Sequence, residues 1–228
     1  MTHREPKGMN LYETLFLVYA GIFITCLIVA NMLVFKFFDF HLPVVGKVTL
    51  SVGILPYPIT FLVTDLISEC YGRKRANKVV YLGFFLSLFM LGILQLGKIV
   101  PLSEIQDPVI QEHYLAVFGQ TTRAVFASMI AYLLAQLLDI RLFHFWKRLT
   151  KGKHLWLRNN GSTMVSQLVD TIAVVTVLFA GVWSTEDIIH VIISSYCFKL
   201  LVALVDTPFF YLGTYLMKKV HVEGPDEF

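Results

Sequence analysis

Long apolar stretches alternate with short polar segments along the whole chain. The long stretches cover residues 14–35, 48–71, 79–100, 122–143, 161–183 and 188–217. A helix needs about 20 apolar residues to cross about 30 Å of hydrocarbon, so each stretch predicts one membrane-spanning helix. The pattern therefore predicts an all-α integral membrane protein with six transmembrane helices, in a single membrane domain that covers residues 1–228.

Two of these stretches depart from a simple straight helix. Gly53, Pro56 and Pro58 interrupt the second stretch. Because proline removes a helical hydrogen bond and displaces the preceding turn, we expect this helix to be kinked or broken. The last stretch could reach about 45 Å at a rise of about 1.5 Å per residue, which exceeds the hydrocarbon core. It should tilt, bend near Pro208 or leave the bilayer.

Lys and Arg residues are distributed unevenly between the two sides of this arrangement. Six crossings put both termini on one side, and 14 of the 19 Lys and Arg residues lie in the segments on that side. Short basic segments are retained in the cytoplasm, so we expect both termini to be cytoplasmic. These segments also account for the net charge of +3. Their expected partner is anionic membrane lipid, and nucleic acid is not expected to bind.

The composition is typical of a membrane protein and gives no sign of an enzyme. Hydrophobic residues make up 56% of the chain, charged residues make up 15%, and the mean hydropathy is +0.67. A soluble domain of this size is far less apolar. Cys26, Cys70 and Cys197 lack the spacing of a metal site or a disulfide framework, and no Walker, GxGxxG, GxSxG or HExxH motif occurs. We therefore expect no metal, no cofactor and no catalytic residue.

Two charged residues are expected to lie deep in the membrane. Asp170 is the only ionisable residue between Gly161 and Trp183. A charged group near a helix centre costs about 2.5–3.5 kcal/mol, so it usually faces the bundle interior, a partner or an aqueous path. Asp170 and Lys199 would both lie about 18–20 Å from the outer face, so they could pair. Such a pair would be either a buried structural contact or part of a substrate path.

An amide and a carboxylate recur at the same spacing on two neighbouring stretches. Gln167 stands three residues before Asp170, so the two share one helix face. Gln136 and Asp139 repeat this arrangement on the preceding stretch, closer to its cytoplasmic end. Asp139 could join a polar path with these residues, or it could form an ion pair in the region of Arg141.

The first two stretches also carry polar residues. Asp65 and Glu69 stand four residues apart in VTDLISE, directly before the basic GRKR. We expect Glu69, next to Arg73 and Lys74, to form an ion pair at the membrane surface rather than to bind a ligand. Asn31 lies in the outer part of the first stretch, where an amide often bridges two helices. The similarity of VTDLI to LVDTI is compatible with a three-plus-three inverted repeat, the architecture of many small-molecule transporters.

Four stretches, in their order and spacing, resemble one family of membrane proteins. They are VTDLISECYGRKRA, LLAQLLDIRLFHFWK, SQLVDTIAV and SSYCFKLLVALVDTP. From about Asn31 to Met217 the chain resembles the queuosine precursor transporter family, also called the vitamin uptake transporter family. The resemblance implies a bacterial inner-membrane importer of 7-deazapurines such as 7-cyano-7-deazaguanine, 7-aminomethyl-7-deazaguanine or queuine. The family motifs fall here on Asp65, Gln136, Asp139, Asp170, Tyr196 and Lys199.

The chemistry of a deazaguanine suits these side chains. Its N1–H and exocyclic amine are two donors for one carboxylate, and its carbonyl accepts from an amide or an ammonium. Asp170 or Asp139 could accept from the donors. Gln136, Gln167 or Lys199 could donate to the carbonyl. We therefore expect uptake of a small-molecule deazapurine by alternating access, with no nucleotide hydrolysed by this chain.

Other interpretations are also compatible with the residues. The chain could be the substrate-binding subunit of an energy-coupling-factor importer, although the AxxxA docking pattern of such subunits is replaced by Ala20 and Ala30, ten residues apart. An intramembrane enzyme could use Asp170 and Asp139 as a carboxylate pair. Proton coupling through a midplane carboxylate, downhill entry followed by metabolic trapping, and assembly into a homo-oligomer stay open.

Overall fold

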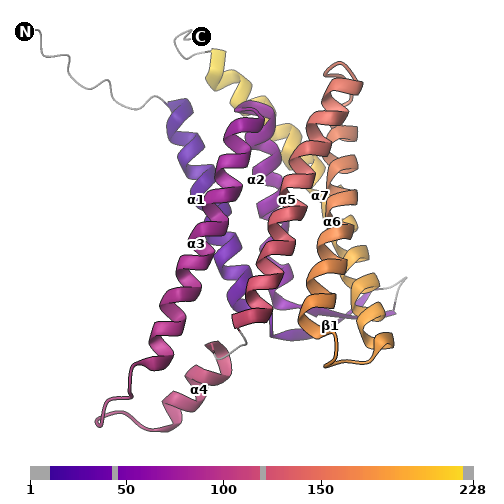
Figure 1. The fold of residues 1–228 in the computed structure, drawn as a ribbon. Helices are drawn as coiled ribbons and strands as arrows, with labels where there is room; N and C mark the ends of the chain where they lie inside the picture. Colours follow the sequence, from indigo (N-terminus) through magenta and orange to yellow (C-terminus); the bar gives the residue numbers. More distant parts are fainter. Residues whose placement is uncertain (1–10, 43–45, 119–121, 223–228) are drawn as a thin grey trace, which may run out of the picture.

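The chain forms a bundle of long helices with a small two-stranded sheet at one end (Figure 1). This computed structural model describes residues 11–42, 46–118 and 122–222. The elements within those ranges are α1 (Leu11–Leu33), β1 (Phe37–Leu42), β2 (Gly46–Ser51), the 3₁₀ helix η1 (Val52–Ile54), α2 (Tyr57–Cys70), α3 (Arg73–Ile99), α4 (Val109–Phe118), α5 (Thr122–Leu149), α6 (Leu155–Phe179) and α7 (Thr185–Val222). Six helical segments of the described chain are long and apolar enough to cross a membrane, which confirms the expected six transmembrane helices.

The second apolar stretch differs most from its expected span. Its first residues, 48–51, belong to strand β2, and helix α2 begins only at Tyr57. Pro56 is the N-cap of α2 and Pro58 lies in the first turn, where a missing N–H has no helical acceptor to lose. The prolines therefore mark the start of a helix instead of a kink within one. Helix α7 runs for 38 residues through Pro208, farther than the expected 188–217.

The antiparallel hairpin of β1 and β2 is a small addition to the expected helices within the described residues. Phe37 pairs with Ser51 at its open end, and strand residues alternate between the two faces of the hairpin. Val48 and Leu50 are buried on the inner face. On the outer face, Asp39 accepts a hydrogen bond from Thr49 at 2.9 Å and pairs with Lys47 at 3.0 Å. Hydrogen bonds from Lys47 and Thr49 lower the pKa of Asp39.

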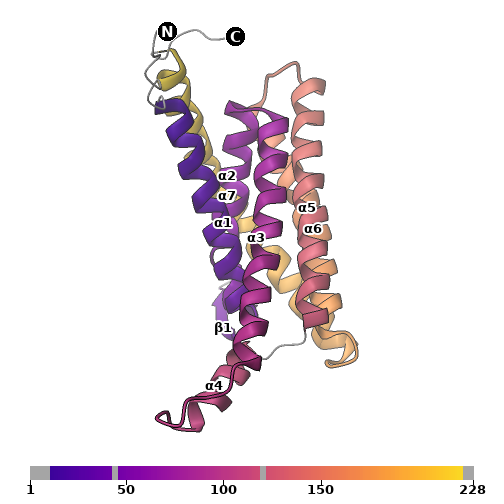
Figure 2. The ribbon, with the colours of Figure 1, turned by 60° about the vertical axis from the view of Figure 1, so that its left-hand side comes forward.

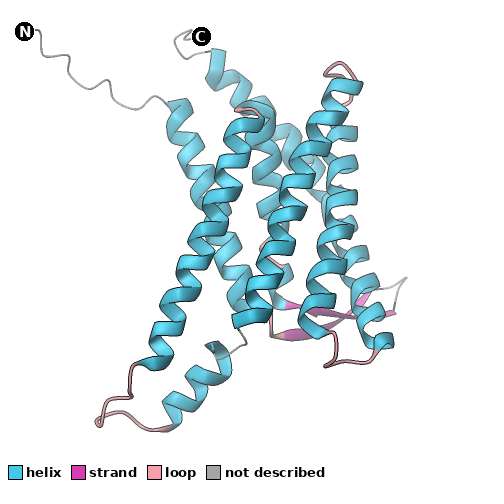
Figure 3. Ribbon diagram, in the orientation of Figure 1, coloured by secondary structure: helices cyan, strands magenta, loops and turns pink. Residues whose placement is uncertain are grey.

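The two ends of the bundle have different characters. Figure 3 shows the strands at one end only, which we call the hairpin end. At the opposite end, α2 turns into α3 and α5 turns into α6, and the helix ends that meet at these two connections are rich in Lys and Arg. We call it the basic end. Helix α1 begins and α7 ends there, as an even number of crossings requires. Figure 2 shows α4 projecting away from the bundle at the hairpin end.

Apolar and polar side chains are buried in different parts of the bundle. Helices α1, α2, α3 and α5 share an apolar cluster that includes the fully buried Phe23, Ile67 and Ile140. The buried face of α6 is instead largely polar and includes Ser166, Asp170 and Thr171. Buried polar groups are costly unless they are satisfied by partners or a ligand, so the polar face of α6 is where a site is expected.

Gly53 allows η1 to approach α1 closely. A Cβ atom at this position would lie 2.7 Å from the carbonyl oxygen of Ala30 and 3.0 Å from Cα of Val34. Because both are backbone atoms, the helix itself would have to move. We expect Gly53→Ala to lower the free energy of unfolding by about 1–3 kcal/mol, as overpacking does in other cores.

Thermal melting of the purified protein in detergent measures this effect. Gly21→Ala is the matched control, because a Cβ there meets nothing within 4 Å. Replacing a helical glycine by alanine stabilises the helix by up to about 1 kcal/mol, so this variant should melt at or above the wild-type temperature. Equal melting temperatures for the two variants would contradict the packing argument.

Candidate functional site

Asp170 on α6 and Lys199 on α7 form a buried ion pair, as their expected depths allowed. Lys199 Nζ lies 2.8 Å from Asp170 Oδ2, and their side chains are 10% and 1% exposed. The second carboxylate oxygen, Asp170 Oδ1, is buried and has no hydrogen-bond partner among the described residues. A charged oxygen left without a donor is costly, so this atom points to a ligand or water as its partner.

A pocket lies beside this pair at the hairpin end of the bundle. It holds about 680 Å³ of empty space, including the space at its mouth. Its walls come from α1, the hairpin, η1, the start of α2, the second half of α6 and the first turns of α7. The walls are largely apolar, and the polar side chains among them are Asn31, Ser51, Tyr57, Asp170, Thr171, Ser195 and Lys199. An apolar pocket with a few convergent polar groups is typical of a small-molecule site.

Tyr57 is a pocket residue that the sequence pattern did not reveal. Lys199 Nζ lies 4.7 Å from the centre of the Tyr57 ring, within the range of a cation–π contact. The ring also packs edge-on against Tyr132, with 5.5 Å between ring centres. Tyr57 is the first residue of α2, between Pro56 and Pro58. The proline pair was the available signal, since it starts a helix inside the membrane and puts this ring beside the ion pair.

The Tyr57 ring is expected to hold the Lys199 ammonium in place for ligand binding. Tyr57→Phe keeps the ring and should bind ligand with near wild-type affinity. Tyr57→Leu removes the cation–π contact, which is worth about 0.5–2 kcal/mol, and should weaken binding about 2–30-fold. Equilibrium binding of a labelled ligand to purified protein checks this order. If Tyr57→Phe loses as much affinity as Tyr57→Leu, the hydroxyl and not the ring is the important group.

A second group of buried polar side chains lies between α2, α5 and α6, nearer the basic end. Asp65 and Asp139 are 1% and 0% exposed. Their carboxyl groups lie in hydrogen-bonding contact with each other. Ser166 Oγ donates to Asp139 Oδ1 at 2.8 Å. Two acidic groups therefore meet across the interface between α2 and the α5–α6 pair.

Uncharged polar groups connect this region to the pocket. Gln136 Nε2 donates to the Tyr132 hydroxyl at 2.7 Å, and Thr64 Oγ1 lies 3.4 Å from Gln136 Oε1. Tyr132 in turn contacts Tyr57 at the pocket. A series of contacts thus runs from Tyr57, through its ring contact with Tyr132, to Thr64, the neighbour of Asp65 in α2.

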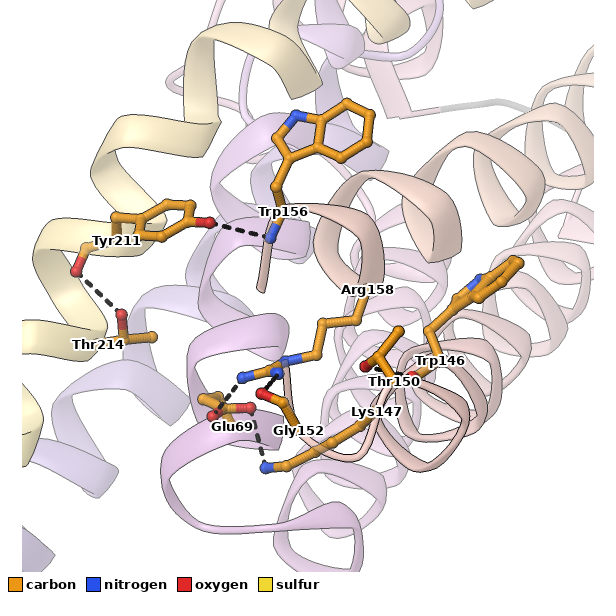
Figure 4. A network of polar contacts seen from close by, with 9 residues as sticks. All are labelled: Glu69, Trp146, Lys147, Thr150, Gly152, Trp156, Arg158, Tyr211 and Thr214. Carbon is orange, nitrogen blue, oxygen red and sulfur yellow. Dashed lines mark hydrogen bonds and ion pairs between the residues drawn. The ribbon is translucent and has the colours of Figure 1, made fainter. Parts of the chain in front are cut away.

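Glu69 ties three helices together at the basic end (Figure 4). Its carboxylate lies 2.9 Å from Lys147 Nζ of α5 and 2.7 Å from Arg158 Nη2 of α6. Arg158 also donates to the carbonyl oxygen of Gly152 at 2.7 Å. The expected ion pair of Glu69 is confirmed. Its partners come from α5 and α6, which pack against α2 here, and not from the adjoining start of α3.

The pocket contains three of the side chains expected to bind substrate. They are Asn31, Asp170 and Lys199. Asn31 Nδ2 is buried without a hydrogen-bond acceptor among the described residues. Gln167 lines a smaller pocket, which adjoins the first at Lys199. The Gln167 Oε1 atom also lacks a described partner.

The remaining expected side chains lie outside both pockets. Asp65, Gln136 and Asp139 belong to the buried polar group nearer the basic end. Tyr196 donates to the carbonyl oxygen of Met164 at 3.2 Å. Their expected contact with substrate stays a prediction, and any such contact would require a conformation other than this one.

Comparison with known proteins identifies the family. The family model described as "Putative vitamin uptake transporter" matches residues 51–213, which include the α2, α6 and α7 walls of the pocket. The chain belongs to this family. Vitamin uptake transporter family membership, together with six apolar helices, makes the chain a multi-pass membrane transporter. The family is one of transporters, in agreement with the expectation that the chain is not an enzyme.

Relatives within the vitamin uptake transporter family agree with the resemblance found in the sequence. A "Probable queuosine precursor transporter" of Bacillus subtilis (strain 168) is 32% identical over 164 residues, covering 72% of this chain and 71% of the relative. The "Queuosine precursor transporter" of Escherichia coli (strain K12) is 25% identical over 159 residues, covering 67% of each chain. A Haemophilus influenzae relative is 27% identical over 157 residues, covering 67% of this chain and 63% of its own. No solved structure matches.

Proposed function

We propose that this chain imports a queuosine precursor, a 7-deazaguanine base, across the bacterial inner membrane into the cytoplasm. The names of the relatives from Bacillus subtilis and Escherichia coli support the substrate class. Within the chain, the observation that carries the proposal is Asp170 Oδ1. It is a buried anionic acceptor in the wall of a mainly apolar pocket, with no donor among the described residues. A deazaguanine supplies the missing donor.

The pocket offers complementary groups for one edge of the base. Asp170 Oδ1 accepts from N1–H or from the exocyclic amine. Asn31 Nδ2, which is also buried and unpartnered among the described residues, donates to the carbonyl. Tyr57 and Phe179 supply aromatic surface for the faces of the ring. A base with these contacts leaves no buried polar atom of Asp170 or Asn31 unsatisfied.

The arrangement of the two ends suits alternating access. The distribution of Lys and Arg supports a cytoplasmic location for the basic end. The pocket then lies toward the outside, and Glu69 holds α2 against α5 and α6 on the cytoplasmic side. This is the geometry of an outward-facing conformation. Release of the base into the cytoplasm requires the contacts of Glu69 to open.

Uptake into liposomes that contain only this chain tests the proposal. Labelled 7-cyano-7-deazaguanine, 7-aminomethyl-7-deazaguanine and queuine are supplied separately, with unlabelled adenine as competitor. We expect saturable uptake of at least one base and no competition by adenine, which lacks the N1–H and carbonyl edge. Uptake that needs an added ATPase partner would favour the energy-coupling-factor interpretation. Absence of uptake for all three bases would contradict the proposed function.

A further inference from the structure

We propose that Asp65 and Asp139 form a proton-binding site whose proton holds the basic end closed. The inference builds on the import function proposed above and assigns a role to two acidic groups outside the pocket. It predicts that ligand binding from the hairpin end is linked to proton uptake. The argument rests on the burial of the pair, on its unsatisfied oxygens and on the helices that it joins.

The two carboxyl groups cannot both be ionised in this arrangement. They are almost completely buried and lie in contact, and two like charges in contact in a low dielectric repel strongly. Asp65 Oδ1 and Asp139 Oδ2 are buried and have no donor among the described residues. One proton satisfies the contact, because a carboxylic acid can donate to a carboxylate. Other acidic pairs in proteins share a proton for the same reason.

The surroundings indicate where this proton resides. Asp139 accepts a hydrogen bond from Ser166 Oγ at 2.8 Å and is also contacted by Ser162, so its charge is stabilised. No side chain of the described residues other than Asp139 donates to or accepts from Asp65. The proton therefore belongs to Asp65, which donates it to Asp139.

No neighbouring cation is available to neutralise a second carboxylate. The ionisable groups that face the pair are Glu69 from α2 and Tyr132 from α5. The basic residue of α6 is Arg158, which pairs with Glu69. The basic residue of α7 at the pocket is Lys199, which pairs with Asp170. Helices α1 and α3 contribute apolar side chains to this part of the core. Among the described residues, no Lys or Arg forms an ion pair with Asp65 or Asp139.

The pair joins the elements that must separate for release into the cytoplasm. Asp139 and Ser166 both belong to the α5–α6 pair, whereas Asp65 belongs to α2, four residues before Glu69. Opening the basic end would part Asp65 from Asp139 and admit water. Both carboxyl groups would then be hydrated and ionised, and the one proton that they had shared would leave to the cytoplasm. Closing the end again would require one proton to return.

This linkage has a definite sign. The outward-facing form, which is closed at the basic end, holds one proton more than the form that is open there. This difference applies in the pH range where a hydrated carboxyl is ionised. Raising the pH therefore favours the form that is open at the basic end. In that form the pocket is no longer accessible from the hairpin end. Affinity for the base should be constant at low pH. It should then fall with rising pH by up to about tenfold per pH unit.

Calorimetric binding of 7-cyano-7-deazaguanine to the purified full-length protein tests this inference. The titration is run at several pH values in two buffers with different ionisation enthalpies, which gives the number of protons taken up. We expect weaker binding and uptake of up to one proton at alkaline pH. Asp65→Asn places a permanent amide donor beside Asp139, so its affinity should not depend on pH and it should take up no proton. Asp39→Asn, on the exposed face of the hairpin, should behave like the wild type.

The outcomes separate this inference from the proposed function. If the base binds with no pH dependence and no proton uptake, the proton site is wrong and the import function stands. If sodium concentration and not pH changes the affinity, the site binds another cation and the inference is also wrong. If the base does not bind, the proposed function fails and infrared spectroscopy of the wild type still decides the matter. A protonated carboxyl band at neutral pH that Asp65→Asn removes supports the site, and its absence overturns it.

Discussion

Asp170→Asn is expected to reduce uptake of the labelled base at least tenfold at matched amounts of protein in the membrane and at low concentrations of base. The substitution removes the negative charge that accepts from the base and leaves the Lys199 ammonium without its counterion. A hydrogen bond to a charged group contributes about 1.5–3 kcal/mol, so affinity should fall about 10- to 150-fold. Lys199→Met should have a comparable effect, because it leaves Asp170 buried without a partner. Uptake of label into liposomes measures both variants.

The double variant Asp170→Asn/Lys199→Met separates recognition from folding. Breaking one side of a buried ion pair costs about 3–5 kcal/mol of stability, whereas replacing both charges by neutral groups is often tolerated. The double variant should therefore melt closer to the wild type than either single variant, yet remain inactive. Wild-type uptake by the double variant would make the pair a structural contact only.

Glu69→Gln is expected to lower the free energy of unfolding by about 3–5 kcal/mol. Arg158 is the reason, since its side chain is 4% exposed and would lose its only described carboxylate partner. The Gly152 carbonyl and the ring of Phe143, 5.8 Å away, would remain as its contacts. Thermal melting in detergent measures the loss. Uptake should also fall, because the closed basic end is less stable.

Glu13→Gln provides the matched control for this substitution. Glu13 also pairs with an arginine at 2.8 Å, but the side chains of Arg75 and Glu13 are 41% and 39% exposed. Exposed pairs contribute about 0–1 kcal/mol, so this variant should melt near the wild-type temperature. A similar loss in the two variants would show that burial of Arg158 is not the cause.

Hydrophobic periodicity was sufficient for the membrane-spanning helices and insufficient for the hairpin. Each crossing needs a long apolar stretch, so counting such stretches finds the helices. The segment from Phe37 to Ser51 has apolar and polar residues in alternation, but it directly adjoins the interrupted second stretch. The predicted span 48–71 therefore includes part of strand β2. Side-chain alternation over six residues is a weak signal next to a membrane span.

Burial cost predicted the ion pair of the site but not the composition of the pocket. Asp170 and Lys199 could be matched because each needs a partner at the same depth. Tyr57 carries no such cost, and only the packing of α2 against α7 brings its ring to Lys199. The contact between Asp65 and Asp139 likewise depends on how α2 meets α5, which spacing along one helix cannot reveal. The inverted repeat stays a prediction.

The hairpin also gives the transporter an exposed surface that is directly connected to the pocket wall. Phe37 and Ser51 belong at once to the hairpin and to the pocket wall, and Asp39 and Lys47 lie exposed farther along the same face of the strands. A binding protein that grips this exposed part and shifts the strands would reshape the pocket without entering it. If the proposed import function and orientation hold, inhibitors of this transporter need not resemble its substrate, and an antibody fragment raised against the hairpin should arrest uptake.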